Sequence, residues 1–434
     1  MSLATSPGRQ AAFATYQDIE PALMTQVRAG VEHQVAVWME FTNGLAGGSQ
    51  FASSHFANGN GRANYLGKLP GYTGRYADPW LAQNTSSAAP LQRIYLVGII
   101  AGGSTADPNA LVRWYSDNGG YSWSAPGLIS GDSTSPAAFF RDKPAVAVSA
   151  AAGSAGYVYV AYIRRNRLTN RNELVVQAST DAGATWKAPT LVTDPATTSH
   201  QAPQVMVDSN GDVYVLWTRW LAGTDELRIA RSPAYSPSTG SMTFTQGLPA
   251  NVGNLYGGAE TFACGAGCAV RAASIPIARL DAARRRIAVA WHRPNGTGGS
   301  VIDFGTVGVP GMGWGPRITL PWNGGNDVQP SMDFDASGNY LVSFYAFGLN
   351  VPTYYNVARY VVLGGSTPVV EDAGQPVHTL SGAVSDVSQY PADVNGMRLL
   401  GEYHDVSFSN GTFKTVGIQI VGYGNPYVFT TTHN

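Results

Sequence analysis

Seven short apolar stretches recur along the chain, and each has the length and composition of one β-strand. They are rich in Val, Tyr and Trp, and each follows a turn that contains Gly, Asn or Asp. The stretches are 34–39, 94–98, 157–162, 213–217, 287–291, 340–345 and 413–418. No long segment has the three-to-four spacing of an amphipathic helix. The pattern therefore predicts an all-β chain with almost no helix.

A proline marks the strand that precedes most of these stretches. The marker prolines are Pro21, Pro79, Pro144, Pro203, Pro276 and Pro330, and the segment 401–404 takes the seventh place without a proline. The marks recur at intervals of about 55 to 75 residues, which is typical of one supersecondary unit repeated along a chain.

Two passages sixty-three positions apart are nearly identical. Residues 116–126 read SDNGGYSWSAP and residues 179–189 read STDAGATWKAP. This order of residues suits a turn that folds back and packs its Trp against the sheet. The spelling Ser-x-Asp-x-Gly-x-Thr-Trp resembles the Asp-box of sialidases and their β-propeller relatives. The second copy fits at every position, whereas the first has Asn118 and Ser122 where Asp and Thr are usual.

The resemblance implies a β-propeller built from four-stranded antiparallel sheets. Because seven second strands can be named, we expect seven blades in a single domain over residues 1–434, with the chain ends sharing one blade. Six blades is the alternative, because sialidases have six and the stretch 362–400 is irregular. The loops 51–72, 232–273 and 364–393 are long enough to cover one face. Asp-boxes lie on the outer rim of hydrolases, lyases, lectins and structural propellers alike, so they predict no particular activity.

Composition supports this interpretation and excludes some partners. The chain has 51 Gly, 26 Pro and only 13% charged residues, which favours turns and strands over salt-bridged helices. A net charge of −1 provides no general field for nucleic acid, and no apolar run reaches membrane-spanning length. We expect a monomer that binds a glycan or oligosaccharide, without nucleic acid, a membrane span, a metal or a cofactor.

The two cysteines bear on the compartment. Cys264 and Cys268 are separated by three residues of a Gly/Ala loop, which favours a local disulfide, because a metal site would need further ligands. A local disulfide would fit an exported protein, so we expect a secreted or periplasmic location. The N-terminus has no basic stretch followed by an apolar one, so the sequence contains no signal peptide and export is an inference.

Polar residues near the marker prolines are the candidates for chemistry. In a propeller the first strand of each blade lines the centre, so these side chains should converge on one mouth. The ring comprises Asp18, Glu20, Asp78, Arg141, Asp142, Lys143, His200, Gln201, Arg271, Ser274, Asp327, Gln329, Glu402, Tyr403, His404 and Asp405. Polar residues beside a water-filled channel also need no function, and Asp before Pro often only caps a turn. Together, the mixed charges favour one ligand site.

The resemblance to sialidases also bears on this ring. Sialidases hold the substrate carboxylate with three arginines, one of which belongs to an Arg-Ile-Pro motif, but residues 18–21 read Asp-Ile-Glu-Pro here. Arg141 and Arg271 lie near the matching place in later blades. The nucleophilic Tyr, its Glu partner and the acid/base Asp of sialidases have loose counterparts in Tyr403, Glu260 and Asp78.

Several functions remain open on these residues. Paired carboxylates could hydrolyse a glycosidic bond, and Asp78, Asp142 and Asp327 supply acids. A polysaccharide lyase would use His, Tyr and Arg to remove a proton beside a uronate carboxylate. The alternatives are a glycan-binding or a protein-interaction propeller without catalysis. Our catalytic candidates are Asp78, Arg141, Asp142, His200, Glu260, Arg271, Tyr403 and His404, and the leading function is a glycoside hydrolase or lyase that acts on an acidic glycan in one central pocket.

Two further acidic segments look like calcium loops. Residues 208–212 and 333–338 both lack the alternating carboxylates and the closing Glu of an EF-hand. We therefore interpret both as turns.

Overall fold

The computed structural model of the chain is nearly all β. It describes residues 4–5, 16–28, 30–42, 49–57, 60–72, 74–86, 92–101, 108–136, 138–193, 199–221, 225–253, 261–272, 275–320, 325–363, 367–370, 378–379, 385–389, 398–399, 404–420 and 426–433. Within these ranges the helical element is a short 3-10 helix, η2 (Val387–Gln389). No helix there has the length and hydropathy to cross a membrane. The prediction of almost no helix is confirmed for these residues.

Four-stranded antiparallel sheets follow one another along the chain. The first contains β2 (Tyr16–Arg28), β3 (Val31–Thr42), β4 (Ser49–Ala57) and β5 (Asn60–Tyr65). The second contains β6 (Arg75–Gln83), β7 (Ile94–Ala101), β8 (Pro108–Ser116) and β9 (Gly127–Pro136). The third contains β10 (Phe139–Val148), β11 (Val158–Asn166), β12 (Asn172–Ser179) and β13 (Thr190–Leu191).

The same order continues in the middle of the chain. The fourth sheet contains β14 (Ser199–Val207), β15 (Val213–Trp220), β16 (Asp225–Ser232) and β17 (Thr245–Gln246), and β18 (Ala250–Gly253) also pairs with β16. The next unit contains β21 (Ile277–Asp281), β22 (Arg286–Pro294), β23 (Ser300–Gly308) and β24 (Gly313–Leu320).

A further unit of four strands is joined to this one. It contains β25 (Asn326–Phe334), β26 (Tyr340–Phe347), β27 (Thr353–Val362) and β28 (Val369–Val370), and β29 (His378–Thr379) and β30 (Ser385–Asp386) also pair with β27. One parallel residue pair, Ser300 with Asn326, joins the two units into a larger sheet.

The last sheet contains both ends of the chain. The N-terminal strand β1 (Ala4–Thr5) pairs with β34 (Pro426–His433), which continues to β33 (Thr412–Ile420) and β32 (Asp405–Ser409). A small separate sheet consists of β19 (Thr261–Ala263), β20 (Ala269–Arg271) and β31 (Arg398–Leu399). The predicted four-stranded antiparallel sheets and the shared sheet at the chain ends are both present.

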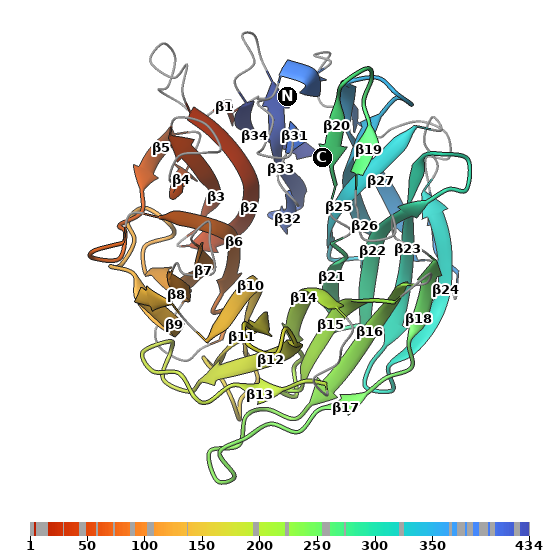
Figure 1. Cartoon of the computed structure of the whole chain (residues 1–434). Helices are drawn as coiled ribbons and strands as arrows, with labels where there is room; N and C mark the ends of the chain where they lie inside the picture. The colour runs from red at the N-terminus through yellow and green to blue at the C-terminus, as the bar shows by residue number, and fades with distance from the viewer. Residues whose placement is uncertain are drawn as a thin grey trace.

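The first strands of the units meet at the centre of the molecule. β2, β6, β10, β14, β21, β25 and β32 pack against one another in this order, and β32 packs against β2. Figure 1 shows the sheets arranged around a common centre. The second strands, β3, β7, β11, β15, β22, β26 and β33, contain the seven apolar stretches of the sequence, except that Tyr157 lies one residue before β11.

The apolar core lies between neighbouring sheets. In β11, Tyr159 and Ala161 pack toward the fourth sheet, whereas Val158 and Val160 pack toward the second. Both faces of such a strand are therefore buried, which explains why the second strands form continuous apolar runs in the sequence.

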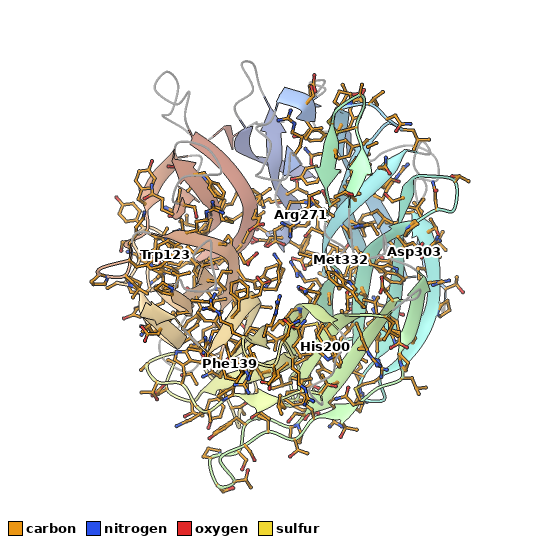
Figure 2. The ribbon with its side chains drawn as sticks, in the orientation of Figure 1. Trp123, Phe139, His200, Arg271, Asp303 and Met332 are labelled. Atoms are coloured by element: carbon orange, nitrogen blue, oxygen red, sulfur yellow. A yellow bond between two sulfur atoms is a disulfide. The ribbon has the colours of Figure 1, made fainter. Side chains whose placement is uncertain are left out.

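The two repeated turns form hydrogen bonds with the preceding sheet. In the second copy, Asp181 accepts hydrogen bonds from the hydroxyl groups of Ser179 and Thr185 and from the backbone N–H of Thr185. The turn reaches the second sheet, where Arg113 donates to the carbonyl oxygen of Gly183 (2.8 Å). In the first copy, the indole N–H of Trp123 donates to Ser53 of β4 in the first sheet (3.1 Å). Figure 2 shows Trp123 away from the centre of the ring.

The last sheet is attached to the first by polar contacts. Lys414 on β33 forms an ion pair with Glu32 on β3 (2.5 Å), and the hydroxyl groups of Thr25 on β2 and Ser407 on β32 lie 2.7 Å apart. These side-chain contacts hold the two ends of the chain together in addition to the backbone pairing of β1 with β34.

Replacement of Asp181 by Ala should destabilise the fold. Burial by itself would raise the pKa of Asp181, but the hydrogen bonds from Thr185 and Ser179 lower it to about 2. The loss of these bonds should lower the free energy of unfolding by about 1–2 kcal/mol at neutral pH, measured by chemical denaturation. Because the pKa is lowered, this contribution is present above the usual Asp pKa and is lost as the pH falls toward 2. Ser209→Ala, at an exposed position of another turn, should leave the stability unchanged.

Candidate functional site

A β-bulge lies at five of the six marker prolines and orients the residue before the proline. These five residues have a left-handed backbone although they are not glycine: Glu20 (φ 55°), Asp78 (φ 54°), Lys143 (φ 50°), Ala202 (φ 51°) and Gln329 (φ 53°). Each lies where the register with the second strand shifts. A bulge interrupts the alternation of side chains and turns one of them to a new direction. Strained non-glycine residues of this kind cluster at functional sites.

Three of the bulge residues contact one another. The backbone N–H of Asp78 donates to the Glu20 carboxylate (3.3 Å), and the Lys143 ammonium group forms an ion pair with Asp78 (2.9 Å). The backbone N–H of Lys143 donates to the side chain of Asp142 (3.1 Å). Glu20 and Asp78 are each 4% exposed, so their carboxylates depend on these partners and not on bulk water. We call Glu20, Asp78, Asp142 and Lys143 the acid cluster.

Burial and mutual repulsion change the pKa values in the acid cluster. Burial raises the pKa of Glu20 to about 8, with a further increase from Asp78, while Lys143 opposes the shift. Burial also raises the pKa of Asp142 to about 6, again against the effect of Lys143. Burial alone would lower the pKa of Lys143, but Asp78, Asp142 and Glu20 raise it. Near neutral pH Glu20 therefore keeps its proton, while the Lys143 ammonium group is paired with Asp78.

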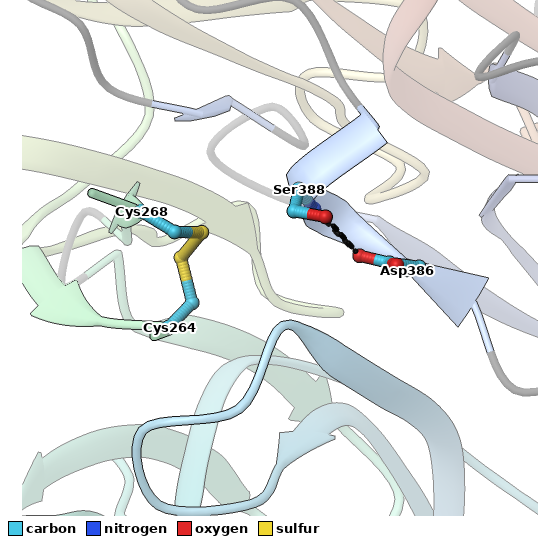
Figure 3. Close-up of a disulfide and its surroundings, with 4 residues drawn as sticks. All are labelled: Cys264, Cys268, Asp386 and Ser388. Atoms are coloured by element: carbon cyan, nitrogen blue, oxygen red, sulfur yellow. Dashed lines mark hydrogen bonds between the residues drawn. A yellow bond between two sulfur atoms is a disulfide. The ribbon is translucent and has the colours of Figure 1, made fainter. Parts of the chain in front are cut away.

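Arg271 reaches the acid cluster from the small separate sheet. Its positive charge lowers the pKa of both Glu20 and Asp142, and Figure 2 shows it near the centre of the ring. Arg271 ends β20, whose hairpin with β19 is closed by the disulfide between Cys264 and Cys268. Figure 3 shows this disulfide next to the segment that contains Asp386 and Ser388. The predicted disulfide is confirmed.

Arg141 lies on the same strand as Asp142 and Lys143, but it contacts the second sheet. Its guanidinium group donates to the hydroxyl group of Ser130 (2.9 Å) and to the carbonyl oxygen of Phe139 (2.9 Å). Its backbone N–H donates to the side chain of Asn109 (2.6 Å). The contacts with Ser130 and Asn109 lie between the second and third sheets, and none of the three lies within the acid cluster.

The two predicted histidines are buried elsewhere: His200 lies on β14, and His404 directly precedes β32. The ring of His404 lies 3.0 Å from the hydroxyl group of Ser343 and packs against Tyr345 (4.8 Å between centroids). His200 packs edge-on against Trp217 (6.3 Å between centroids). Burial lowers the pKa of His200 to about 4 and that of His404 to about 3. Both rings are therefore uncharged at neutral pH.

Some predicted residues lie outside the described part of the chain. Glu260, Ser274, Glu402 and Tyr403 are among them, and the side chain of Asp18 is also outside it. The structure thus brings together Asp78, Asp142 and Arg271 from the catalytic candidates. It adds Glu20 and Lys143, which the sequence placed in the polar ring without a catalytic role. In the sequence, Glu20 and Lys143 can be recognised because each lies directly before a marker proline.

The described residues contain no group of three or more His, Cys, Asp or Glu side chains that could hold a metal ion. The two segments that look like calcium loops form turns. Asp208 accepts from the backbone N–H groups of Asn210 and Asp212, both at 2.9 Å, and Asp335 accepts from that of Asn339 (2.9 Å). The interpretation of these segments as turns is confirmed.

Comparison with known proteins identifies the fold. No known protein family and no curated protein sequence matches the chain. A protein of unknown function from Dyadobacter fermentans DSM 18053 aligns over 78% of this chain and 93% of its own, at 17% identity and a TM-score of 0.51. An α-L-arabinofuranosidase from Fusarium graminearum, solved with an iminosugar inhibitor, aligns over 81% of this chain and 94% of its own, at 13% identity and a TM-score of 0.50.

A sialidase is also among the similar structures. The Trypanosoma rangeli sialidase in complex with the inhibitor DANA aligns over 96% of this chain and 55% of its own, at 10% identity and a TM-score of 0.46. The two structures with TM-scores of 0.50 and 0.51 show that the chain shares their overall fold. At these identities the likeness extends to the fold alone, so the chemistry of this propeller has to be argued from its own side chains.

A second polar layer lies in the centre of the propeller. The Asp405 carboxylate accepts from Arg279 on β21 (2.7 Å), from Ser331 on β25 (3.3 Å) and from the backbone N–H of Leu23 on β2 (3.1 Å). It thereby joins three inner strands to its own strand, β32. Asp333, which is half-buried, accepts from the backbone N–H of Phe408 on β32.

Sequence reasoning missed two residues of this layer. Arg279 and Asp333 each follow a marker proline by three residues and stand in otherwise apolar inner strands, which is the signal that could have found them. Burial raises the pKa of Asp333 to about 6, and Arg279 opposes this shift. The layer is fully engaged in contacts between strands, so we assign it to the closure of the propeller.

Asp327 should make the stability of the propeller depend on pH. Asp327 is 1% exposed, and burial raises its pKa to about 8 although the positive charge of Arg359 opposes the shift. Because the pKa of Asp327 is higher in the folded than in the unfolded chain, the proton on Asp327 stabilises the fold. This contribution is present below the usual Asp pKa and is lost as the pH rises through 8. The Tm of Asp327→Asn minus the Tm of the native protein should therefore be about 2 °C higher at pH 8 than at pH 5, measured by calorimetry.

Asp117→Asn is the control for this experiment, because Asp117 lies on an exposed outer turn. Its Tm difference from the native protein should be the same at both pH values. An equal response of the two variants would contradict the assignment to Asp327.

Proposed function

We propose that the chain is a seven-bladed, Asp-box type β-propeller that cleaves glycosidic bonds in an acidic glycan at the acid cluster. The cyclic packing of the seven inner strands supports the blade number. The disulfide between Cys264 and Cys268 supports a secreted or periplasmic location, because such bonds persist in oxidising compartments. We take the active form to be a monomer.

The observation that carries the proposal is the contrast between Glu20 and Asp78. Glu20 has a pKa of about 8 because it is buried, so it retains its proton at neutral pH. Asp78, whose backbone N–H contacts the Glu20 carboxylate, forms an ion pair with Lys143. Glycoside hydrolysis requires one carboxyl group that donates a proton and one carboxylate that acts as a base or nucleophile. Neighbouring carboxyl groups with different protonation states supply this pair.

Each residue of the cluster then has a distinct role. Glu20 would protonate the glycosidic oxygen as the sugar leaves. Asp78 would stabilise the positive charge that develops on the sugar ring or direct water to it, and Asp142 would add negative charge beside it. Lys143 and Arg271 are the cations of the cluster, and they would bind a carboxylate of the substrate. This last point is the reason for an acidic glycan.

Screening of substrates tests the reaction class. The purified protein should release sugar from uronate polysaccharides more than from sialosides or neutral glycans, with product release and binding both measured. A lyase would instead generate an unsaturated, ultraviolet-absorbing product without the addition of water. Binding without turnover would contradict the proposal and favour a glycan-binding propeller.

Conservative substitutions in the acid cluster test the residue roles. Glu20→Gln removes the donated proton and Asp78→Asn removes the charge, and each should lower kcat by about 100-fold or more. Asp117→Asn makes the same chemical change on the outer turn and should leave kcat unchanged. Retention of full activity by both Glu20→Gln and Asp78→Asn would refute the assignment, provided that the variants fold with native circular dichroism.

The pH dependence of the rate provides an independent test. Activity should decline as the pH rises above about 8, because Glu20 loses its proton, and as it falls below about 6, because Asp142 becomes protonated. The kcat/KM profile of the native protein should therefore be bell-shaped. In Asp142→Asn the acidic limb should flatten while the alkaline limb remains, and an unchanged acidic limb would rule out this role for Asp142.

A further inference from the structure

A row of charged and polar residues crosses the fourth sheet outside the acid cluster. The pairing register places His200 on β14 opposite Arg219 on β15, and Arg219 opposite Glu226 on β16. Trp217 lies two residues from Arg219 and contacts the ring of His200, so it shares this face. Arg228 is opposite Trp217 and completes the group. The apolar residues of the same face pack toward the third sheet.

This face lies next to the proposed catalytic centre. His200 stands two residues before Ala202, the bulge residue of β14. β14 packs directly against β10, the strand that carries Asp142 and Lys143. Figure 2 shows His200 on the opposite side of the centre from Arg271. The row is therefore adjacent to the acid cluster but built on different strands.

Several buried nitrogen atoms of this face have no hydrogen-bond partner among the described residues. They are Nδ1 and Nε2 of His200, Nε1 of Trp217 and Nε of Arg219. His200 is 2% exposed and Trp217 is 1% exposed. A buried donor without an acceptor costs about 1–3 kcal/mol, so a fold that keeps three such side chains together is suited to receive acceptor atoms from outside.

The charge of the face identifies the kind of acceptor. Glu226 accepts from Arg228 (2.9 Å) and forms a longer ion pair with Arg219 (3.6 Å), so one carboxylate faces two guanidinium groups. The net charge is therefore positive. The indole and guanidinium nitrogens can only donate hydrogen bonds, and a carboxylate or sulfate can only accept them. Charge-assisted bonds from arginine to such oxyanions are strong and well directed.

We propose that His200, Trp217 and Arg219 form an oxyanion-binding site that takes a carboxylate or sulfate group of an acidic glycan. The His200 ring forms the buried floor of the site, and Trp217 and Arg219 supply hydrogen-bond donors. The glycan identity rests on the proposed function, whereas oxyanion binding is detectable without turnover. This site assigns His200 to substrate binding and not to proton transfer at the acid cluster.

Nuclear magnetic resonance of labelled histidine tests the site directly. The signal of His200 is assigned by its loss in His200→Phe, and the full-length protein is titrated with galacturonate, inorganic sulfate and galactose. Burial, and then Arg219 and Arg228, lower the pKa of His200. A bound anion should raise it and shift the signal saturably with galacturonate, with sulfate, or with both. The two anions distinguish a carboxylate from a sulfate site, and galactose should have no effect.

Matched charge variants test the assignment. Arg219→Gln should weaken anion binding about ten-fold or more, whereas Arg285→Gln, on an exposed turn at the other end of the sheets, should not change it. The proposal is overturned if neither anion gives a saturable shift, if galactose gives the same shift, or if the two arginine variants bind equally well. Catalysis can fail in the acid-cluster variants without any change in this titration, so the two proposals are separable.

Discussion

The left-handed residue before five of the six marker prolines is the constraint on which the centre of the propeller depends. An ordinary strand directs its side chains to two faces in turn, and here neighbouring sheets cover both faces. The bulge interrupts this alternation, so that Glu20, Asp78 and Lys143 contact one another instead of entering the apolar layers between sheets. Each strained residue costs about 1–3 kcal/mol, and the surrounding pairing and packing offset that cost.

Burial then sets the charge states of the side chains that the bulges bring together. A buried carboxylate remains ionised only where a cation or donors compensate for lost water. Asp78 forms an ion pair with Lys143, whereas Glu20 keeps its proton because burial raises its pKa. In the second polar layer, the Asp405 carboxylate likewise accepts hydrogen bonds from Arg279 and from the backbone N–H of Leu23. The charge states of the acid cluster and the contacts of the second polar layer thus arise from one physical balance between desolvation and pairing.

The two proposed sites divide opposite charges between neighbouring strands. Carboxyl groups gather on β2, β6 and β10, and the row on β14, β15 and β16 has an excess of guanidinium groups. A glycan that carries an anionic group offers both features, a bond to be protonated and an oxyanion to be bound. One fold can host many reactions, so this arrangement of charges, and not the fold, is the argument for function.

The sequence alone determined the strands, the repeat and the disulfide, because each is local: apolar runs, turn residues and two nearby cysteines specify them without distant contacts. It also identified the positions before the prolines as polar. Only the tertiary structure decided which of these side chains meet. Arg141 and Lys143 lie two residues apart on β10, yet Arg141 contacts the second sheet and Lys143 the acid cluster. The bulge between Asp142 and Ala145 shifts the register at that point. Arg271 reaches the centre from a separate hairpin that no repeat predicted. Side-chain direction depends on register and on neighbouring sheets, which a pattern of residue types does not contain.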